Sequence, residues 1–559
     1  MTLQHVLSQL ENRQSMYESA IRQLPLALLP GLQGNGIPEF VSEKERPLLH
    51  EAVRSILPIL SNNPYQYHLS GRWISVSKKR IAVLFSGGPA SGGHNVLIGL
   101  LDCLSGHELW GVRRGPKGLL AGDLVRIDSS MRDEWVNTGG FDWLGSDRTK
   151  IKTPEQINQV RGVIVAHQLN GIIIIGGDDS NTNAAFLAEA VSDLGCAVIG
   201  VPKTIDGDLQ VGQDVPISFG FDTATKIYAE LVGNILQDAR SSGKYWHVVK
   251  LMGRSASHVA LEVALQTHPP ITLISEEVAH HGWRLSELVN RVVRQIIRRA
   301  EHGFHYGVMV IPEGLIEAIA ELRDLVAAIN HMMVKQAEEF QPLDAIMRYD
   351  RAMEYLDTSQ RQTLSLLPAG IAHSFFKDRD SHGNLQLSHI PTESLLISLI
   401  EKELTQHSLP NGFVFQPIHH FFGYEGRCGA PTRFDATYCY NLGWVAGALA
   451  LNGVTGMMAA VGQFQQGWQA MGIPLVSMIS PENRGGGVSW VIEKTLVDLT
   501  SPAFAYFKLA RDRWCDTDLF SSPGPRQLMG DLAMQYPISV ALNQGLSSLN
   551  WEVPTCVSG

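Results

Sequence analysis

The stretch GIIIIGGDDS, residues 171–180, decides the fold class of this chain. Its apolar run has the length of a strand and does not alternate with polar residues, which predicts a strand buried on both faces of a parallel sheet. Two glycines and two aspartates follow at once, where the strand ends. Because ligands of α/β proteins bind at the carboxyl ends of strands, this loop is a candidate binding site.

A second stretch, AVIGVPKTIDGD at residues 197–208, repeats the arrangement of a buried strand followed by a polar loop. Together the two loops hold three glycines, four aspartates and one lysine. Glycine lets a phosphate approach the backbone, carboxylates hold magnesium or accept a proton, and lysine neutralises phosphate charge. This mixture of residue types indicates phosphoryl transfer.

Strands and helices alternate over most of the chain on either side of these loops. The apolar runs predict strands over residues 81–85, 171–175, 197–201, 246–251, 271–275 and 306–311. The 3.6-residue periodicity predicts helices over residues 95–104, 155–169, 181–194, 222–239, 256–266 and 284–301. This alternation is typical of α/β architecture with largely parallel sheets.

One apolar segment, residues 442–462, resembles a membrane span and carries a GxxxG motif at Gly443 and Gly447. Asn452-Gly453 interrupts it in the middle, and Asn-Gly is a turn signal. We therefore expect a buried helix to about Leu451, a turn and then a strand, and no membrane partner.

The composition limits the partners and the compartment. The chain has 559 residues, a formal net charge of −10 and no long basic block, so nucleic acid is an unexpected partner. Its six cysteines are dispersed and form no CxxC pair, which favours reduced thiols. The N-terminal residues lack the apolar core of a signal peptide. We expect a cytoplasmic protein.

Two further glycine-rich loops could bind anions. Residues 86–95, SGGPASGGHN, lie between the first predicted strand and a helix, an arrangement that suits either an anion cradle or a plain tight turn. The loop matches neither the Walker pattern nor GxGxxG. Residues 139–150 supply more glycines and Arg148, which could reach a phosphate or simply lie at the surface.

These loops, in this order, resemble those of the phosphofructokinase family. The later segments MGR at 252–254, PEG at 312–314, GYEGR at 423–427 and FDATY at 434–438 strengthen the match, which runs from about residue 78 to the C-terminal region. The resemblance implies two Rossmann-like domains with parallel sheets flanked by helices. It also implies transfer of a phosphoryl group to the 1-hydroxyl of fructose 6-phosphate, in glycolysis or gluconeogenesis.

The resemblance also implies a division of the chain. We expect an N-terminal helical arm over residues 1–75 and a pyrophosphate- and Mg²⁺-binding domain over 76–240, completed by part of 430–559. A fructose 6-phosphate-binding domain would span 241–430, with a helical insertion at about 315–408. The last segment, 431–559, would pack back on the first domain.

The phosphoryl donor is indicated by two positions. ATP users of the family look like GGDGS and PGTIDND, whereas this chain has GGDDS and PKTIDGD, which resembles the pyrophosphate type. Asp179 would face the α-phosphate of ATP, and two like charges about 4 Å apart repel by about 4 kcal/mol at an effective dielectric near 20. That repulsion weakens ATP binding about a thousandfold. Lys203 could meet pyrophosphate, pair with Asp179, or do both.

The resemblance assigns roles residue by residue. Asp206 would accept the proton of the sugar hydroxyl, Asp178 would hold Mg²⁺, and Asp179 and Lys203 would act on the donor. The residues expected to bind substrate are Gly88, Arg148, Thr204, Asp208, Lys244, Tyr245, Met252, Gly253, Arg254, Glu313, Tyr424 and Arg427.

Lys244 and Tyr245 occupy the position where the family contributes residues across a subunit interface, which implies a homodimer or a higher homo-oligomer. Two residues depart from the family pattern: Ser91 replaces a proline, and Met457 stands where pyrophosphate users often have tyrosine. The alternatives are an ATP-dependent phosphofructokinase and a non-catalytic regulatory subunit, although the chain keeps Asp178, Lys203 and Asp206.

Overall fold

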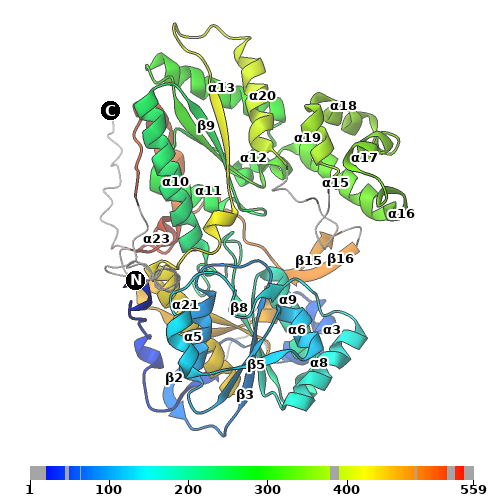
Figure 1. The fold of residues 1–559 in the computed structure, drawn as a ribbon, viewed down its shortest axis with the longest axis vertical. Coiled ribbons are helices and arrows are strands. Elements are labelled where there is room, and N and C mark those ends of the chain that lie inside the picture. The colour runs from blue at the N-terminus through cyan, green and yellow to red at the C-terminus, as the bar shows by residue number, and fades with distance from the viewer. Residues whose placement is uncertain are drawn as a thin grey trace, which may run out of the picture.

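Two β-sheets, one in each half of the molecule, organise the fold (Figure 1). The computed structural model describes residues 20–43, 49–62, 65–377, 385, 390–484, 487–524 and 535–546. In Figure 1 the larger sheet lies in the lower half and the smaller sheet in the upper half. The loops after β7 and β8, residues 176–180 and 202–208, lie where the two halves meet.

The large sheet has ten strands with a parallel centre. Its order is β1 (Ile37–Ser42), β2 (Tyr67–Ile74), β14 (Gln469–Pro474), β13 (Met457–Gly462), β8 (Ala197–Pro202), β7 (Gly171–Gly176), β3 (Arg80–Ser86), β4 (Glu108–Val112) and β5 (Leu124–Ile127), with β6 (Ser146–Asp147) paired to β3. Strands β13, β8, β7, β3 and β4 run parallel, and antiparallel strands close both edges. The carboxyl ends of β3, β7 and β8 therefore meet at one edge.

The isoleucine run of β7 shows why this strand is central. Ile173 and Ile175 pack with α5 (Gly93–Cys103) and α21 (Arg433–Leu451) on one face, whereas Ile172 and Ile174 pack with α8 (Pro154–His167) and α9 (Asp178–Ala190) on the other. Successive side chains of a strand point to opposite faces, so a strand covered on both faces is apolar throughout.

The small sheet is wholly parallel. Its order is β10 (Ile271–Thr272), β11 (Gly307–Pro312), β9 (Trp246–Leu251) and β12 (Pro417–Phe422). Helices α10 (Phe221–Ser242), α11 (His258–Thr267), α12 (Ser275–His281) and α13 (Leu285–Glu301) accompany it. The order and type of the elements predicted between residues 81 and 311 are confirmed.

Helices fill the predicted insertion and the remaining connections. Those of the insertion are α14 (Leu315–Ala318), α15 (Ala320–Lys335), α16 (Ala337–Phe340), α17 (Ala345–Ala352), α18 (Thr358–Leu366), α19 (Ala369–Ser374) and α20 (Thr392–Leu404). Figure 1 shows α15 to α19 standing beside the upper half. The other helices are α3 (Val53–Ile56), α4 (Pro58–Asn62), α6 (Gly115–Ala121), α7 (Arg132–Trp135), α22 (Pro502–Thr517) and α23 (Ile538–Asn543).

The structure differs from the expected division at both ends of the chain. The described part of residues 1–75 contains β1 and β2, which join the large sheet, so it is not only a helical arm; residues 1–19 lie outside the described residues. At the other end, α21, β13 and β14 join the first half, but α22 and α23 contact α11 in the second half. Helix α10 also contacts β9 and β11, which moves the expected boundary at 240 toward residue 220.

The apolar segment 442–462 forms the end of α21 and the strand β13, as the Asn-Gly turn predicted. No helix within the described residues is long and apolar enough to cross a membrane. Gly443 instead allows α21 to approach α5, because a Cβ atom there would lie 2.2 Å from the Val96 carbonyl oxygen. The GxxxG motif therefore serves helix packing inside the protein.

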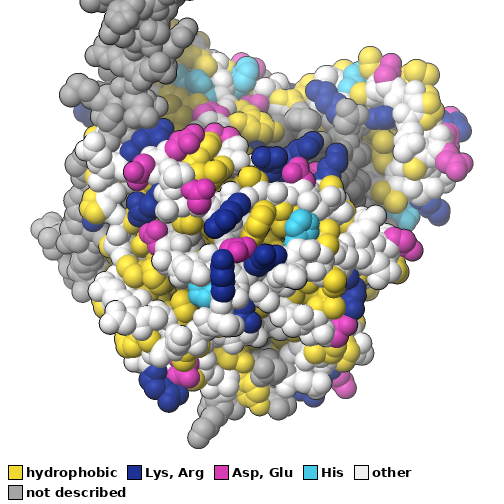
Figure 2. Space-filling view, turned by 60° about the horizontal axis from the view of Figure 1, so that its bottom comes forward, with side chains coloured by type: hydrophobic (Ala, Val, Ile, Leu, Met, Phe, Trp, Pro, Cys, Tyr) yellow, Lys and Arg dark blue, Asp and Glu magenta, His cyan; other side chains and the backbone are white. Residues whose placement is uncertain are grey.

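On the face drawn in Figure 2, the Lys and Arg side chains lie in small groups beside Asp and Glu side chains. No continuous basic stripe crosses the described residues of this face. Such a stripe is the usual footprint of nucleic-acid binding.

Candidate active site

The two loops that opened the sequence analysis lie side by side. Strands β7 and β8 are parallel neighbours, with Gly176 opposite Pro202. The Lys203 amide continues the ladder by donating to the Gly176 carbonyl oxygen at 3.0 Å. Asp178 and Asp179 begin α9, while the 203–208 loop passes next to them. The adjacent registers of two buried strands thus bring the predicted carboxylates and Lys203 together.

The loop after β3 adds backbone and cationic groups to this edge. Gly88 has so little space that a Cβ atom would lie 1.9 Å from Nη2 of Arg427 and 3.6 Å from Nη2 of Arg148. Lys203 Nζ lies 3.4 Å from the corresponding position on Gly87, whose positive φ of 87° favours glycine. Three cations from three different loops therefore converge on the Gly87-Gly88 turn.

The neighbouring cations affect the pKa of Lys203. Its side chain is buried, and burial together with Arg427 and Arg148 lowers its pKa to about 8, while Asp206 and Asp178 oppose the shift. Like charges packed this closely repel each other unless an anion lies between them. The arrangement suits a small polyanion such as a chain of phosphates.

The carboxylates form a matching acidic group. Burial raises the pKa of Asp206, and Lys494, the Arg254 backbone N–H and Lys203 oppose that shift. Burial and the charges of Asp206 and Asp178 raise the pKa of Asp208 to about 8. A bound cation would relieve this mutual repulsion, because it favours the charged form of each carboxylate.

Asp179, the fourth carboxylate of the two loops, has a basic partner. Its Oδ1 atom accepts a hydrogen bond from Lys150 Nζ at 2.9 Å, and both side chains are at least two-thirds buried. Lys150 comes from the 139–150 segment, where the sequence analysis had singled out Arg148 as the candidate cation. Thr204, in the neighbouring loop, accepts from the Asp206 amide through Oγ1 at 3.0 Å.

The loops after β9 and β11 face the same site from the small sheet. The Gly253 amide donates to Glu313 Oε2 at 3.2 Å, and Gly314 is pressed against Arg254, where a Cβ atom would lie 2.3 Å from the Arg254 carbonyl oxygen. Burial and the nearby Asp206 raise the pKa of Glu313 to about 7. Arg254 and Glu313 thus lie beside Asp206 of the 203–208 loop, with Met252 and Gly253 next to them along the chain.

The segment after β12 connects the two halves. The Met252 amide donates to the Phe422 carbonyl oxygen at 3.0 Å, and the Arg427 guanidinium lies 5.4 Å from the centre of the Tyr424 ring. Arg427 Nε also donates to the Pro89 carbonyl oxygen at 3.5 Å. Arg427 therefore reaches the glycine loop of the large sheet from the small sheet, and Tyr424 lies beside its guanidinium.

Lys244 and Tyr245 are not brought to this site within one chain. They precede β9, whereas Met252 follows it, and about 3.3 Å per residue separates the two ends by roughly 23 Å. The Lys244 ammonium lies 4.8 Å from the centre of the Tyr245 ring.

Like Lys150, the charged residue Lys494 was not among the site residues predicted from the sequence. Its Nζ atom lies 2.8 Å from Ser255 Oγ and 3.8 Å from Asp178 Oδ2. It follows the hairpin of β15 (Ile479–Arg484) and β16 (Gly487–Ile492) and belongs to no motif used above. A lysine that follows Val491, Ile492 and Glu493 forms no recognisable motif, so nothing in the sequence marks this position.

The two departures from the family pattern have structural roles. Ser91 is fully buried and donates from Oγ to the Gly429 carbonyl oxygen at 2.7 Å. Met457 is buried in β13, opposite Ile199 of β8. Neither side chain adds a charge to the group of loops.

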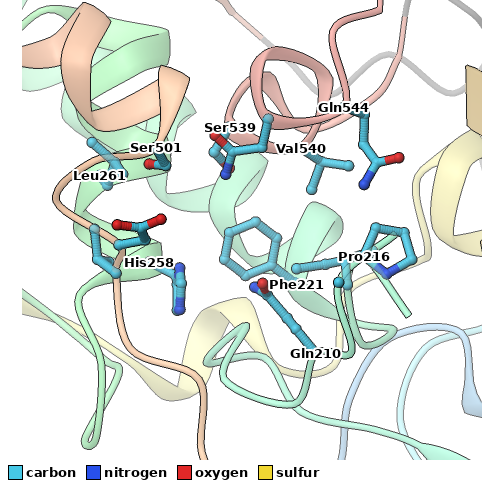
Figure 3. Close-up of a pocket in the computed structure, with 14 residues that line it drawn as sticks. Gln210, Pro216, Phe221, His258, Leu261, Ser501, Ser539, Val540 and Gln544 are labelled. Atoms are coloured by element: carbon cyan, nitrogen blue, oxygen red, sulfur yellow. The ribbon is translucent and has the colours of Figure 1, made fainter. Parts of the chain in front are cut away.

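A separate pocket of about 60 Å³ lies between the 210–217 loop and α23 (Figure 3). Figure 3 shows Phe221 and Gln210 below Ser539 and Val540 of α23, with His258 to one side. Gln210 Nε2 donates to the Gly207 carbonyl oxygen at 2.5 Å. The pocket therefore adjoins the 203–208 loop without containing its charged side chains.

Fold and site together define an α/β protein with a cluster of cations and carboxylates at the carboxyl ends of its central strands. A family model described as phosphofructokinase matches residues 80–361. The chain is 45% identical over 467 residues to the pyrophosphate–fructose 6-phosphate 1-phosphotransferase of Treponema pallidum (strain Nichols), covering 81% of each chain. It belongs to the phosphofructokinase family.

Other relatives extend this similarity. The Porphyromonas gingivalis protein of the same name is 40% identical over 503 residues, covering 88% of this chain and 90% of that one. Subunit beta 2 of the Arabidopsis thaliana phosphotransferase is 41% identical over 497 residues, with 86% and 85% covered. The solved pyrophosphate-dependent phosphofructokinase from Marinobacter aquaeolei shares the fold, with a TM-score of 0.51 at 15% identity over 81% of this chain and 96% of that one.

Proposed function

We propose that this chain transfers a phosphoryl group from pyrophosphate to the 1-hydroxyl of D-fructose 6-phosphate, giving fructose 1,6-bisphosphate and phosphate, and that the reaction is reversible. The observation that carries the choice of donor is the position of the Asp179 carboxylate in the first turn of α9, where a hydrogen bond from Lys150 Nζ at 2.9 Å holds it. The relatives at 40–45% identity carry pyrophosphate in their names and support the same choice.

The donor would lie on the turn at Gly87 and Gly88, below Arg148, Lys203 and Arg427. Backbone N–H groups there would bind phosphate oxygens, and the three cations would stabilise charge on the transferring group. By the resemblance to the family, Asp179 would face a third phosphate, which would meet a carboxylate there. The site therefore fits a donor of two phosphates better than one of three.

Asp206 is the proposed base. It lies in the loop between the donor cations and the sugar-binding segment, and the Arg254 backbone N–H holds it by a hydrogen bond. Its carboxylate would take the proton from the 1-hydroxyl as the oxygen attacks phosphorus. Thr204, whose Oγ1 accepts from the Asp206 amide, would hold the loop and face the transferred group.

The sugar phosphate would bind on the small-sheet side. Arginine suits the 6-phosphate through paired hydrogen bonds, so Arg254 and Arg427 are its proposed ligands. Glu313 would accept from a sugar hydroxyl, with Met252, Gly253 and Tyr424 shaping the pocket.

Mg²⁺ fits the site through Asp178, with Asp208 orienting the loop or the metal. No group of three or more His, Cys, Asp or Glu side chains among the described residues is arranged to hold a metal by itself. Mg²⁺ is usually bound by one or two carboxylates together with waters and substrate phosphates, so this arrangement suits it. Bound Mg²⁺ would neutralise phosphate charge.

We also propose that the protein is a homodimer or a higher homo-oligomer in the cytoplasm. Lys244 and Tyr245 would then serve the sugar site of a second subunit. The cysteines within the described residues are free thiols, which suits a reducing compartment.

The donor assignment is tested by removing its two marker side chains. Asp179→Gly combined with Lys203→Gly should allow ATP to bind, because it removes the carboxylate that would repel the α-phosphate by up to about 4 kcal/mol, the part offset by Lys150 reducing that figure. Calorimetric titration with ATP measures this gain, and Asp179→Asn, which keeps the side-chain volume, separates charge from size. No gain of ATP binding in either variant would count against the charge argument.

A further inference from the structure

Lys494 stands at the border between the two proposed subsites. Its Nζ atom lies 2.8 Å from Ser255 Oγ, next to the sugar-phosphate ligand Arg254, and 3.8 Å from Asp178 Oδ2 on the donor side. The side chain is about two-thirds buried, with 31% of its surface exposed. A lysine that contacts both subsites lies where the phosphoryl group would pass from the donor to the sugar.

The backbone that carries Lys494 is fixed to both halves. The Thr495 amide donates to the Asp208 carbonyl oxygen at 2.7 Å, and His258 Nε2 donates to the Thr495 carbonyl oxygen at 2.9 Å. The Val497 amide donates to Glu276 Oε1 at 3.0 Å, and the same oxygen accepts from the Ser257 amide at 3.0 Å. The position of Lys494 is therefore built into the fold.

The charges around Lys494 are mainly acidic. Asp206, Asp208 and Glu317 lie within electrostatic range of its ammonium group, in addition to Asp178. The charge of Arg254, a cation of the site, also acts on Lys494. Lys494 thus supplies positive charge beside the same carboxylates, Asp178 and Asp206, that face Lys203.

We propose that Lys494 contacts the transferring phosphoryl group and stabilises its charge, as a second lysine alongside Lys203. In this step the sugar O1 forms a bond to phosphorus, and the bridging P–O bond breaks with its electron pair on the departing phosphate. The O1 proton passes to Asp206. The inference rests on the proposed function, since it names one more residue of that reaction.

The test compares Lys494→Met with Lys508→Met, a lysine-to-methionine change at an exposed position on α22. In the full chain, Lys494→Met should lower kcat with pyrophosphate about a hundredfold, the scale expected on losing one preorganised donor to the transition state. Lys508→Met should match the wild type. Calorimetric binding of fructose 6-phosphate and the thermal midpoint should change little in both variants, and Lys494→Arg should recover part of kcat.

A merely structural or metal-balancing role gives different results. If Lys494 only neutralises Asp178, Lys494→Met will lower the Mg²⁺ concentration needed for half activity and leave kcat at saturating Mg²⁺ unchanged, which overturns the proposal. If Lys494→Met lowers kcat and also lowers the thermal midpoint, and neither Lys494→Arg nor Lys494→Gln recovers kcat, the role is structural and the proposal is overturned. Absence of pyrophosphate turnover in the wild type would instead contradict the proposed function itself.

Discussion

At the scale of single residues, Asp206 connects the donor and acceptor sides of the site. It is bonded to the Arg254 amide and lies near Lys203 and Lys494. Asp206→Asn removes the proton acceptor and keeps the shape of the side chain, so kcat should fall by about 10²- to 10⁴-fold. Calorimetric titrations should show both substrates binding within a few-fold of the wild type. A variant that retains most of its kcat would exclude Asp206 as the base.

Glu313 makes stability depend on pH. Its pKa is raised to about 7 by burial, so between roughly pH 4.5 and 7 the folded chain binds more protons at this site than the unfolded chain. The free energy of unfolding should therefore fall as pH rises through this window. Glu313→Gln, which stays neutral, should reduce that fall, as measured by denaturant unfolding at pH 5 and pH 8. Identical pH profiles would contradict the assigned shift.

Sequence motifs located most residues of the candidate site because short loops after buried strands fix their positions. Asp178 and Lys203 meet since β7 and β8 are adjacent, which a parallel α/β pattern already favours. Lys494 could not be found in this way. It reaches Asp178 through a linker whose path depends on contacts with His258, Glu276 and Asp208 across both halves.

At the scale of elements, helices α5 and α21 pack at unusually close range. A Cβ atom on Gly99 would lie 2.1 Å from the Tyr440 carbonyl oxygen, and one on Gly443 would lie 2.2 Å from the Val96 carbonyl oxygen. Gly443→Val should destabilise the protein by about 1–3 kcal/mol or more, as overpacking does. Denaturant unfolding measures the change.

Gly370→Ala is the matched control for that change. This glycine lies in α19 with nothing near its Cβ position, so alanine should be neutral or slightly stabilising there. A Gly443→Val protein as stable as Gly370→Ala would show that the two helices can separate without loss.

The strands that the sequence predicted are those with continuous apolar runs. Strands β1 and β2 were missed because they lie at the edge of the sheet, and β2 is only partly buried along its length. β5 and β12 are also partly exposed edge strands, and their sequences carry no strong strand pattern. A strand can thus be predicted from the sequence when its residues form a continuous apolar run.

At the scale of the whole molecule, Lys244 is expected to complete the sugar site of a second subunit, and this expectation can be tested by mutation. Lys244→Ala should raise KM for fructose 6-phosphate roughly tenfold or more, the scale of a lost charge-assisted hydrogen bond, without raising KM for pyrophosphate. Mixing Lys244→Ala subunits with Arg254→Ala subunits should restore activity, since a mixed dimer contains one intact site. If the mixed Lys244→Ala and Arg254→Ala proteins remain as inactive as each variant alone, Lys244 does not contribute to the site of a second subunit.

The central claim concerns the phosphoryl donor, and one assay addresses it directly. The chain, purified alone, is given fructose 6-phosphate and Mg²⁺ with either pyrophosphate or ATP, and fructose 1,6-bisphosphate formation is followed by a coupled assay. We predict rapid turnover with pyrophosphate and kcat/KM for ATP lower by about a thousandfold. Turnover with ATP but not pyrophosphate would contradict the account.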